Sequence, residues 1–443
     1  MGRIGRTVKA GAILWFISFP SVLPSVPSVP SLPSVLSPTA SAQASFEQAA
    51  RDLSSSDADT RLRAALLLRD AASHEAALPL ARAVVDTQDE VQLAAIAAEL
   101  NIFLAEKMVP RKRVALVVEV RNQILAEPAF SAGPSALGPA PAPPEVLDAL
   151  RFAARDDNPR VAIEALYAFG TLGDTPAGAA RRELLTRSGP DVASLLGAAD
   201  PAKRYAAARV MGRLFAKRPK DDPLDPTVGD AVITALNDSD RAVKNAAMRA
   251  LGSMRYERGV QALTDLFTFY GKGDIAEAAL DALAHIAHPS SVRLFLAQLP
   301  GRNASLRVIA IEGLARAGDP ARLAEIRTAA DADHSDVVTL ATAFASALLE
   351  NGPVDRIVDA LTRPKLRDRA RQYVAEIAAR RATSFGRHLL DPDERIRLDV
   401  VEALGLAGDR AALPLIEPVL QDRDPQVARA AERAVARLRA LAP

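Results

Sequence analysis

The stretch LDPDERIRLDVVEALGLAGD (390–409) carries the pattern that decides the fold. It opens with a polar turn, continues with the apolar anchor Ile396, and places small or apolar residues four, seven and eight positions later. Positions with this spacing share one face of a helix that has 3.6 residues per turn. Two further copies are plain, NDSDRAVKNAAMRALGSM (237–254) and QDRDPQVARAAERAVARL (421–438). The stretch is therefore one unit of a helical repeat.

The anchor recurs at a nearly constant interval through the second half of the chain. The anchors of this run are Val243, Ile275, Leu306, Val337, Leu366, Ile396 and Val427, which are 29 to 32 residues apart. Earlier copies have their anchors at Leu62, Val91 and Val161, and a degenerate copy lies near Lys203. A period of this length is typical of a solenoid, in which each unit packs mainly on its neighbours.

Each unit is predicted to contain two helices. An Asp or Asn three residues before the anchor can accept hydrogen bonds from the first free amides of a helix, as at Asp59, Asn158, Asp240, Asn303, Asp393 and Asp424. This first helix ends near a glycine, as at Gly173, Gly252, Gly318 and Gly408. A second apolar helix follows, for example SVRLFLAQL (291–299). The pattern thus predicts antiparallel helix pairs.

The units resemble the HEAT-repeat family, including the short bacterial form also seen in phycobilisome-lyase-type proteins. The resemblance rests on the D-x-x-V/I/L start, on the A-L-G end at 250–252 and 403–405, and on the basic residue after the anchor, namely Arg63, Lys244, Arg307 and Arg397. It implies an all-α fold, an α-solenoid or superhelix of stacked antiparallel helix pairs, with about ten units over residues 45–443.

The resemblance also implies how such a protein works. HEAT solenoids bind protein partners on a concave surface, which we expect the second helices to line. The exposed candidates for that surface are Gln261, Thr264 and Asp265. The partner itself is not specified by the repeat.

Two stretches interrupt the array. EPAFSAGPSALGPAPAPPE (127–145) is a loop rich in Pro, Ala and Gly that cannot be helical throughout. Because repeats lie on both sides of it, we interpret it as a surface insertion and not as a domain boundary. KRPKDDPLDPTVGD (217–230) is a shorter interruption.

Residues 1–44 have the three parts of a secretory signal peptide. Arg3, Arg6 and Lys9 precede the apolar core AGAILWFISF (10–19), and small-residue cleavage patterns end at Ala42 and Ala44. We therefore predict export to the periplasm or the extracellular space. The core is too short to span a bilayer and prolines follow it, so the mature chain should carry no transmembrane anchor. The alternative is cleavage before the prolines, which would leave the Ser-Val-Pro run (20–44) as a stalk.

Composition narrows the function classes. The chain has 55 basic and 54 acidic residues, 4% aromatic residues and no cysteine. A near-neutral chain that is poor in aromatics gives little reason to expect nucleic acid as the partner. We find no P-loop, G-x-S-x-G or H-E-x-x-H motif, and we predict no catalytic residue and no cofactor. The favoured interpretation is a non-catalytic scaffold, and the alternative is an accessory subunit or a lyase-like enzyme that handles a cofactor.

One stripe of potential metal ligands occurs in the sequence. Asp281, His285 and His288 are spaced i, i+4, i+7 on a predicted helix and could supply metal ligands. The buried stripe of that helix, which includes Ile275 and Ile286, lies roughly 130° away, so the three side chains should face solvent. We therefore predict no metal site.

A basic stretch supplies the one candidate binding site. Residues 203–220 contain seven Lys or Arg residues and no acid, and Arg209, Arg213 and Lys217 form an i, i+4, i+8 stripe. An acidic protein face, a polyanion or a membrane surface with anionic headgroups could bind there. The alternative is a solvated helix face that acids on neighbouring repeats neutralise. A second basic stretch, 363–387, contains two acids.

Overall fold

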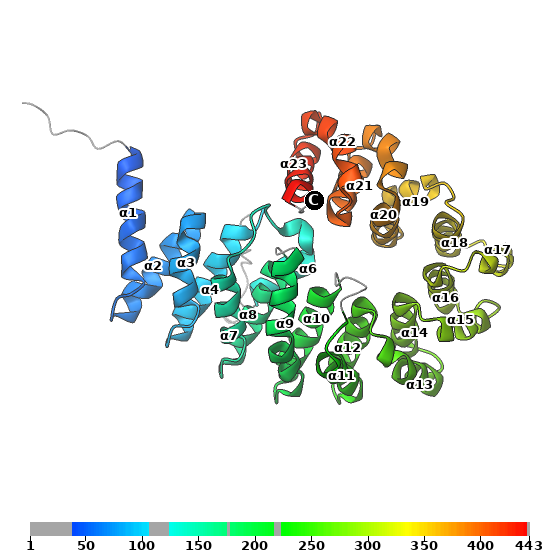
Figure 1. The fold of residues 1–443 in the computed structure, drawn as a ribbon, viewed down its shortest axis with the longest axis horizontal. Coiled ribbons are helices and arrows are strands. Elements are labelled where there is room, and N and C mark those ends of the chain that lie inside the picture. The colour runs from blue at the N-terminus through cyan, green and yellow to red at the C-terminus, as the bar shows by residue number, and fades with distance from the viewer. Residues whose placement is uncertain (1–37, 106–123, 175–177, 217–222, 441–443) are drawn as a thin grey trace, which may run out of the picture. The chain divides into compact units, whose positions relative to one another are not determined.

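The computed structural model describes residues 38–105, 124–174, 178–216 and 223–440. The chain divides into two compact units, residues 1–45 and 46–443, and the second unit contains the repeats. Its helices follow one another as antiparallel pairs (Figure 1), which confirms the predicted α-solenoid. The predicted signal peptide belongs to the other unit, where residues 1–37 lie outside the described part of the chain.

The first helices of the pairs pack on one another in chain order. They are α2 (Ala58–Ala71), α4 (Asp89–Phe103), α8 (Pro159–Leu172), α10 (Pro201–Phe215), α12 (Arg241–Met254), α14 (Asp274–Ile286), α16 (Ala304–Ala317), α18 (Asp336–Leu349), α20 (Arg367–Arg381), α21 (Glu394–Ala407) and α23 (Pro425–Ala440). Their buried faces are largely alanine, leucine and valine. Small side chains at these contacts let the helix axes approach closely, and this close layer is continuous along the array.

Except for α9, the second helices are shorter than the first helices, and 3-10 turns precede or extend most of them. They are α3 (Ala77–Ala83), α7 (Pro144–Ala153), α9 (Gly178–Ser194), α11 (Pro226–Thr234), α13 (Val260–Tyr270), α15 (Val292–Gln298), α17 (Leu323–Asp331), α19 (Asp355–Asp359), η9 (Ala382–Leu390) and α22 (Leu413–Ile416). Among the helices of the described residues, α1 (Pro38–Asp52) and α6 (Ala126–Ala132) stand outside the pairs. Within the described residues, no helix combines the length and the apolar character that a membrane span requires.

Asp and Asn side chains start the first helices at most of the predicted positions. The confirmed caps are Asn158, Asp240, Asn303, Asp393 and Asp424, whose side-chain oxygens accept backbone amides. The prediction for Asp59 is wrong, because Asp57 accepts the amide of Thr60 at 2.9 Å and caps α2. Both acids stand in the same short stretch, so the sequence pattern alone could not separate them. The register of this repeat therefore begins two residues earlier than predicted.

The same register error affects the apolar anchors. Most predicted anchors are buried, as Val243, Leu306 and Val427 illustrate. Val337 is only half-buried, whereas its neighbour Val338 is fully buried, because α18 begins one residue later than the pattern indicates.

An arginine four residues after the cap joins each of four repeats to the next. These pairs are Arg61–Asp86, Arg204–Asp238, Arg307–Asp333 and Arg397–Asp422. In the first of these repeats the basic residue of the motif is Arg61, so the assignment of that position to Arg63 is wrong. Each arginine also donates to backbone carbonyls in the turn before its own helix. Because charge-assisted bonds are the strong ones, these pairs fix the stacking of successive repeats.

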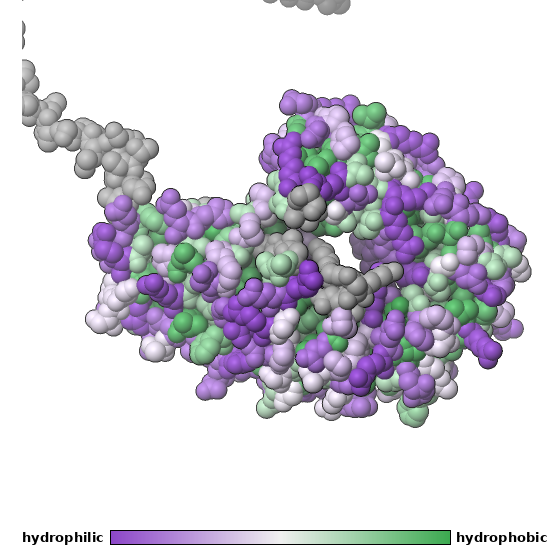
Figure 2. All heavy atoms as spheres, in the orientation of Figure 1, coloured by the Kyte–Doolittle hydropathy of each residue, from purple (hydrophilic) through white to green (hydrophobic). Residues whose placement is uncertain are grey.

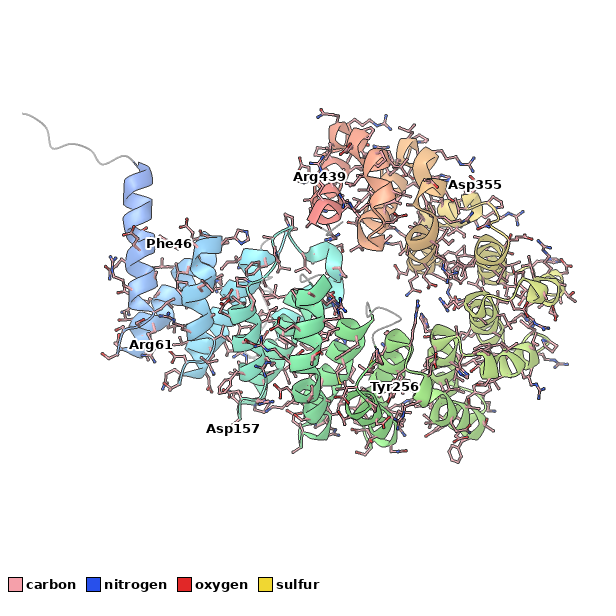
Figure 3. The ribbon with its side chains drawn as sticks, viewed as in Figure 1. Phe46, Arg61, Asp157, Tyr256, Asp355 and Arg439 are labelled. Carbon is pink, nitrogen blue, oxygen red and sulfur yellow. The ribbon has the colours of Figure 1, made fainter. Side chains whose placement is uncertain are left out.

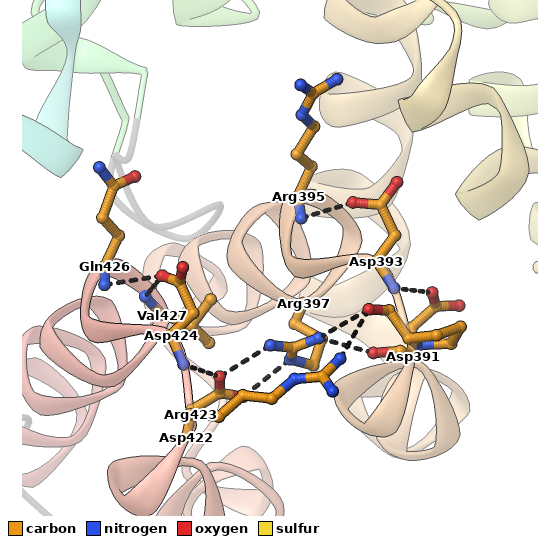
Figure 4. A network of polar contacts seen from close by, with 10 residues as sticks. Asp391, Asp393, Arg395, Arg397, Asp422, Arg423, Asp424, Gln426 and Val427 are labelled. Atoms are coloured by element: carbon orange, nitrogen blue, oxygen red, sulfur yellow. Dashed lines mark hydrogen bonds and ion pairs between the residues drawn. The ribbon is translucent and has the colours of Figure 1, made fainter. Parts of the chain in front are cut away.

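The last of these pairs shows the geometry in detail (Figure 4). Arg397 Nε and Nη2 lie 2.7 and 2.8 Å from the two carboxylate oxygens of Asp422. Arg397 Nη1 donates to the carbonyl of Asp391 at 2.8 Å, while Asp422 Oδ1 accepts the amide of Asp424 at 2.8 Å. The bond from Arg397 outweighs burial and lowers the pKa of the Asp422 carboxyl. Figure 3 labels Arg61, which makes the equivalent bond at the start of the array.

The glycines of the repeat have two roles. Gly318 and Gly408 terminate α16 and α21 with φ of 79° and 75°, as expected for residues that end a helix. Gly252 lies inside α12, where an added Cβ would sit 3.0 Å from Ala282 Cα. Gly405 is similarly placed, 2.9 Å from Ala434 Cα. The A-L-G motif therefore records a close approach of adjacent first helices.

Candidate functional site

A cavity of about 1620 Å³ lies between the N-terminal repeats and the C-terminal repeats of residues 46–443. One side is formed by the segment that follows α6, by the start of α7 and by α9. The other side is formed by the C-terminal ends of α16, α20, α21 and α23. Figure 2 shows hydrophilic residues spread widely over the visible face of these helices, with apolar residues between them. The cavity thus brings together residues, such as Pro134 and Arg437, that are 303 positions apart in the sequence.

The cavity is lined only in part by the second helices that we expected to form a binding surface. Second helices α7 and α9 do line the cavity, but on the C-terminal side the lining comes from first helices. Gln261, Thr264 and Asp265 lie on α13 and are not among the lining residues. Their polar groups are used locally, since Gln261 Nε2 donates to Asp265 at 2.8 Å and Thr264 donates to the Val260 carbonyl. The pattern of a helix pair does not reveal which helix faces a distant repeat.

Arginine dominates the charge of the cavity. Among the described lining residues, six are arginines and four are carboxylates. Each carboxylate has an arginine partner: Asp148 pairs with Arg151 and Arg187, Asp174 with Arg181 and Arg213, Glu183 with Arg187, and Glu376 with Arg316. Arg255 and Arg380 also line the cavity, and within the described part of the chain neither has an ion pair. The cavity therefore has a surplus of positive charge.

A buried polar network supports one wall of the cavity. Arg316 of α16 makes two bonds to Glu376 of α20, at 2.8 and 3.0 Å, although the two residues are sixty positions apart. Tyr373 donates to Glu312, and its ring stacks on Phe344 with centroids 4.0 Å apart. Burial opposes the charge of Arg316, but its bonds to Glu376 and the nearby Glu312 raise its pKa overall. This network could not be predicted from the sequence, because charge pairing between helices two repeats apart has no fixed spacing.

The insertion is not a surface loop, contrary to our prediction. Its helix α6 packs on α8, and Phe130 and Leu137 are buried. The carboxylate of Glu164 accepts the amides of Leu125 and Ala126, at 2.6 and 2.7 Å, and so caps the start of α6. Gly170 makes room for the helix, since a Cβ there would lie 2.8 Å from the Phe130 ring. The insertion is therefore part of the packed structure and one wall of the cavity.

The predicted basic stripe holds this insertion. Arg209 Nη1 lies 2.5 Å from Glu127, and Arg209 Nη2 donates to the Ser131 hydroxyl at 2.9 Å. Arg213 donates to the Phe130 carbonyl at 2.5 Å and pairs with Asp174. Lys217, the third predicted member, lies outside the described residues. Arg209 and Arg213 thus have partners within the protein, and an anionic partner for them stays a prediction.

The histidines of the candidate metal stripe, His285 and His288, contact polar groups of their own segment. His285 Nδ1 lies 2.9 Å from the Asp281 carbonyl and 3.6 Å from its carboxylate. His288 is the cap of the next 3-10 turn, where its Nδ1 lies 2.7 Å from the Ser290 hydroxyl. Across the described ranges, no group of three or more His, Cys, Asp or Glu side chains is placed to hold a metal ion.

One buried carboxylate lies outside the cavity. Glu99 of α4 is fully buried, and neither of its carboxylate oxygens has a hydrogen-bond partner in the described structure. Burial raises the pKa of this carboxyl well above its usual range. Glu99 is therefore a source of instability at neutral pH and above.

Comparison with known proteins agrees with the repeat fold. Residues 189–268 match the family model described as HEAT repeats. Among solved structures, the complex of CpcE and CpcF of phycocyanin lyase from Nostoc is 20% identical over 56% of this chain and 94% of that one, with a TM-score of 0.36. Yeast importin-beta (Kap95p) is 16% identical, with a TM-score of 0.35; the match covers 89% of this chain and half of that chain.

An engineered protein of a structural genomics consortium is 19% identical over 54% of this chain and 98% of its own, with a TM-score of 0.37. No curated protein sequence matches this chain. With TM-scores below 0.5, none of these structures indicates a shared function.

Proposed function

We propose that this HEAT-repeat protein is an exported scaffold that binds protein partners in the cavity between its N-terminal and C-terminal repeats. The observation that carries this proposal is the cavity itself. Its volume of about 1620 Å³ exceeds the roughly 300–1,000 Å³ of a typical small-molecule site. A segment of a protein is an occupant of suitable size.

The lining of the cavity favours binding over catalysis. Each of its four carboxylates is paired with an arginine, so none of them stands free to act as a general acid or base. The described lining residues include no histidine, serine or lysine. We therefore propose a non-catalytic role.

Export is the second part of the proposal, and it rests on the sequence of residues 1–44. A basic start, an apolar core and the small-residue pattern ending at Ala42 and Ala44 are the grounds for it. The partner is accordingly sought in the cell envelope or outside the cell. Sequencing of the mature N-terminus tests this part: a start near residue 43 or 45 supports it, whereas a mature chain that begins at Met1 contradicts it.

A pull-down from the cell envelope tests the binding function. Ala379 of α20 is exposed and lines the cavity, so Ala379→Trp should fill space there without disturbing the core. Ala324→Trp is the matched control, because Ala324 is exposed on second helix α17 and does not line the cavity.

We expect the wild type and Ala324→Trp to capture the same partner and Ala379→Trp to lose it. Capture of nothing above background by the wild type would refute the scaffold function. Equal capture by both variants would refute the cavity as its site.

A further inference from the structure

The arginines of α10 show how this fold holds a peptide segment. Arg209 and Arg213 stand nine and thirteen residues after the cap Asp200. Arg209 binds an acid and a hydroxyl four residues apart on α6, Glu127 and Ser131. Arg213 binds the Phe130 carbonyl near the C-terminal end of α6. Cations are favoured at that end of a helix because its last carbonyls are unsatisfied.

Helix α23 repeats this arginine pair in the same register. Arg433 and Arg437 stand nine and thirteen residues after the cap Asp424. Arg437 lines the cavity and donates to the Pro134 carbonyl at 3.0 Å, much as Arg213 donates to the carbonyl of Phe130. Within the described residues, neither Arg433 nor Arg437 has a carboxylate within ion-pair distance. Helix α23 therefore carries the same arginine pair as α10, but the described chain supplies no acid equivalent to Glu127 to bind it.

Two further arginines of the cavity have no acidic partner within the described chain. Arg255, at the end of α12, and Arg380, on α20, are exposed in the cavity and have no ion pair within the described chain. Arg316 also lines the cavity, but it is already bonded to Glu376, and its Nη1 lies 3.7 Å from Glu312. Within the described chain, Arg255 and Arg380 are therefore the exposed arginines of the cavity with which an incoming carboxylate can pair.

From these contacts we infer that the cavity binds an acidic peptide segment of the partner protein. Its carboxylates pair with Arg255 and Arg380, and a backbone carbonyl accepts from Arg437. The inference rests on the proposed scaffold function and names the chemistry of its partner. An acidic segment complements the positive charge of the cavity better than a neutral or basic one. Helix α6, which Arg209 and Arg213 bind through an acid and a carbonyl, is an example of such binding within this chain.

The test uses the full-length protein and a fluorescein-labelled acidic peptide. The peptide is built of alanine and glutamate with the glutamates at i, i+4, and its control has glutamine at every glutamate position. Binding is followed by fluorescence anisotropy. The test variant is Arg255→Gln/Arg380→Gln, because neither side chain makes a hydrogen bond on which folding depends. Arg293→Gln/Arg356→Gln removes the same charge from the exposed faces of second helices α15 and α19.

We expect the acidic peptide to bind and the glutamine peptide not to bind. Arg255→Gln/Arg380→Gln should weaken binding by about tenfold or more, whereas the control pair should bind within about twofold of wild type. Binding should also fall as the salt concentration rises. Wild-type affinity in Arg255→Gln/Arg380→Gln, or equal binding of the two peptides, would overturn the inference.

Two further outcomes are distinguishable. If inorganic polyphosphate displaces the peptide at equal charge concentration, the site recognises charge alone and the inference of a peptide partner is wrong. If the envelope pull-down captures a partner through the cavity but the acidic peptide does not bind, the scaffold function stands and its assigned chemistry fails.

Discussion

Replacement of Arg397 by methionine tests the idea that arginine pairs fix the stacking of the repeats. Only 4% of the Arg397 side chain and 9% of the Asp422 side chain are exposed. Methionine keeps much of the apolar stem but removes both bonds to Asp422 and the bond to the Asp391 carbonyl. Asp422 would remain nearly buried with its backbone amide donor alone.

The cost of this change follows from the burial of the pair. Removal of one partner of a buried ion pair typically costs about 3–5 kcal/mol. Asp422 keeps one amide bond and lies at the edge of a turn that water can reach, so we expect the lower end, about 3 kcal/mol. Because Asp422→Asn also removes the pair, Arg397→Met/Asp422→Asn should cost less than the two single changes added together.

Urea unfolding followed by circular dichroism measures this cost. A repeat array can unfold in stages, so hydrogen exchange in α21 and α23 should show where the stability is lost. The matched control is Arg395→Met, since Arg395 is exposed and its side chain has no hydrogen bond or ion pair within the described chain, and we expect a change below about 0.5 kcal/mol. The reasoning is refuted if Arg397→Met costs less than about 1 kcal/mol or if the double-mutant cycle is additive.

The pair also gives a defined pH dependence. The pKa of the Asp422 carboxyl is lowered in the folded protein, chiefly by the bond from Arg397, relative to a usual value of 3.8. Its contribution to stability is therefore fully present above that value and is lost as the pH falls through the lower, folded pKa. The stability gap between wild type and Arg397→Met should thus narrow when unfolding is repeated at acidic pH. A gap that widens on acidification would contradict this assignment.

Three other changes test separate features of the structure. Gly405→Val should cost about 1–3 kcal/mol in urea unfolding, because its side chain would collide with the Ala434 backbone, while Gly197→Ala, in open space, should be nearly neutral. Glu99→Gln should abolish the loss of stability that the wild type suffers as the pH rises above the usual carboxyl value of 4.5, because the raised pKa of Glu99 makes its ionisation destabilising; thermal melts of the two proteins that change in parallel with pH would contradict it. Arg209→Gln should release α6, seen as faster hydrogen exchange over 126–138, and unchanged exchange there would show that packing alone holds the helix.

The sequence was sufficient for the architecture because the repeat is local. The caps at Asp240 and Asp393 and the anchors that follow them depend only on residues within one helix. The predicted start of a helix was wrong where two acids that could each cap it lie close together, as Asp57 and Asp59 do. The bonded acid of each arginine pair was missed, although its signal was present: Asp238, Asp333 and Asp422 each stand two residues before the residue at which the next first helix is capped.

The candidate site was much less predictable, for a physical reason. Its groups come from repeats that are far apart, and their meeting depends on the small rotation between successive units, summed along the array. The Arg316–Glu376 bonds and the cavity itself are consequences of that sum. The insertion was misread because a Pro-rich composition indicates only that a segment is not one long helix. It says nothing about whether Phe130 and Leu137 find a core to join.

The insertion also changes how the array should behave as a whole. In a simple solenoid each unit contacts only its neighbours, so stability is a sum of local terms. Here the bond from Arg437 to the Pro134 carbonyl joins residues 303 positions apart, and Arg209 and Arg213 hold the other end of the same segment. Release of α6 would therefore remove a restraint from α23 as well as from α10. It follows that Arg209→Gln should raise hydrogen exchange at the C-terminal repeat too, whereas a purely neighbour-coupled array would confine the change to the repeats around α10.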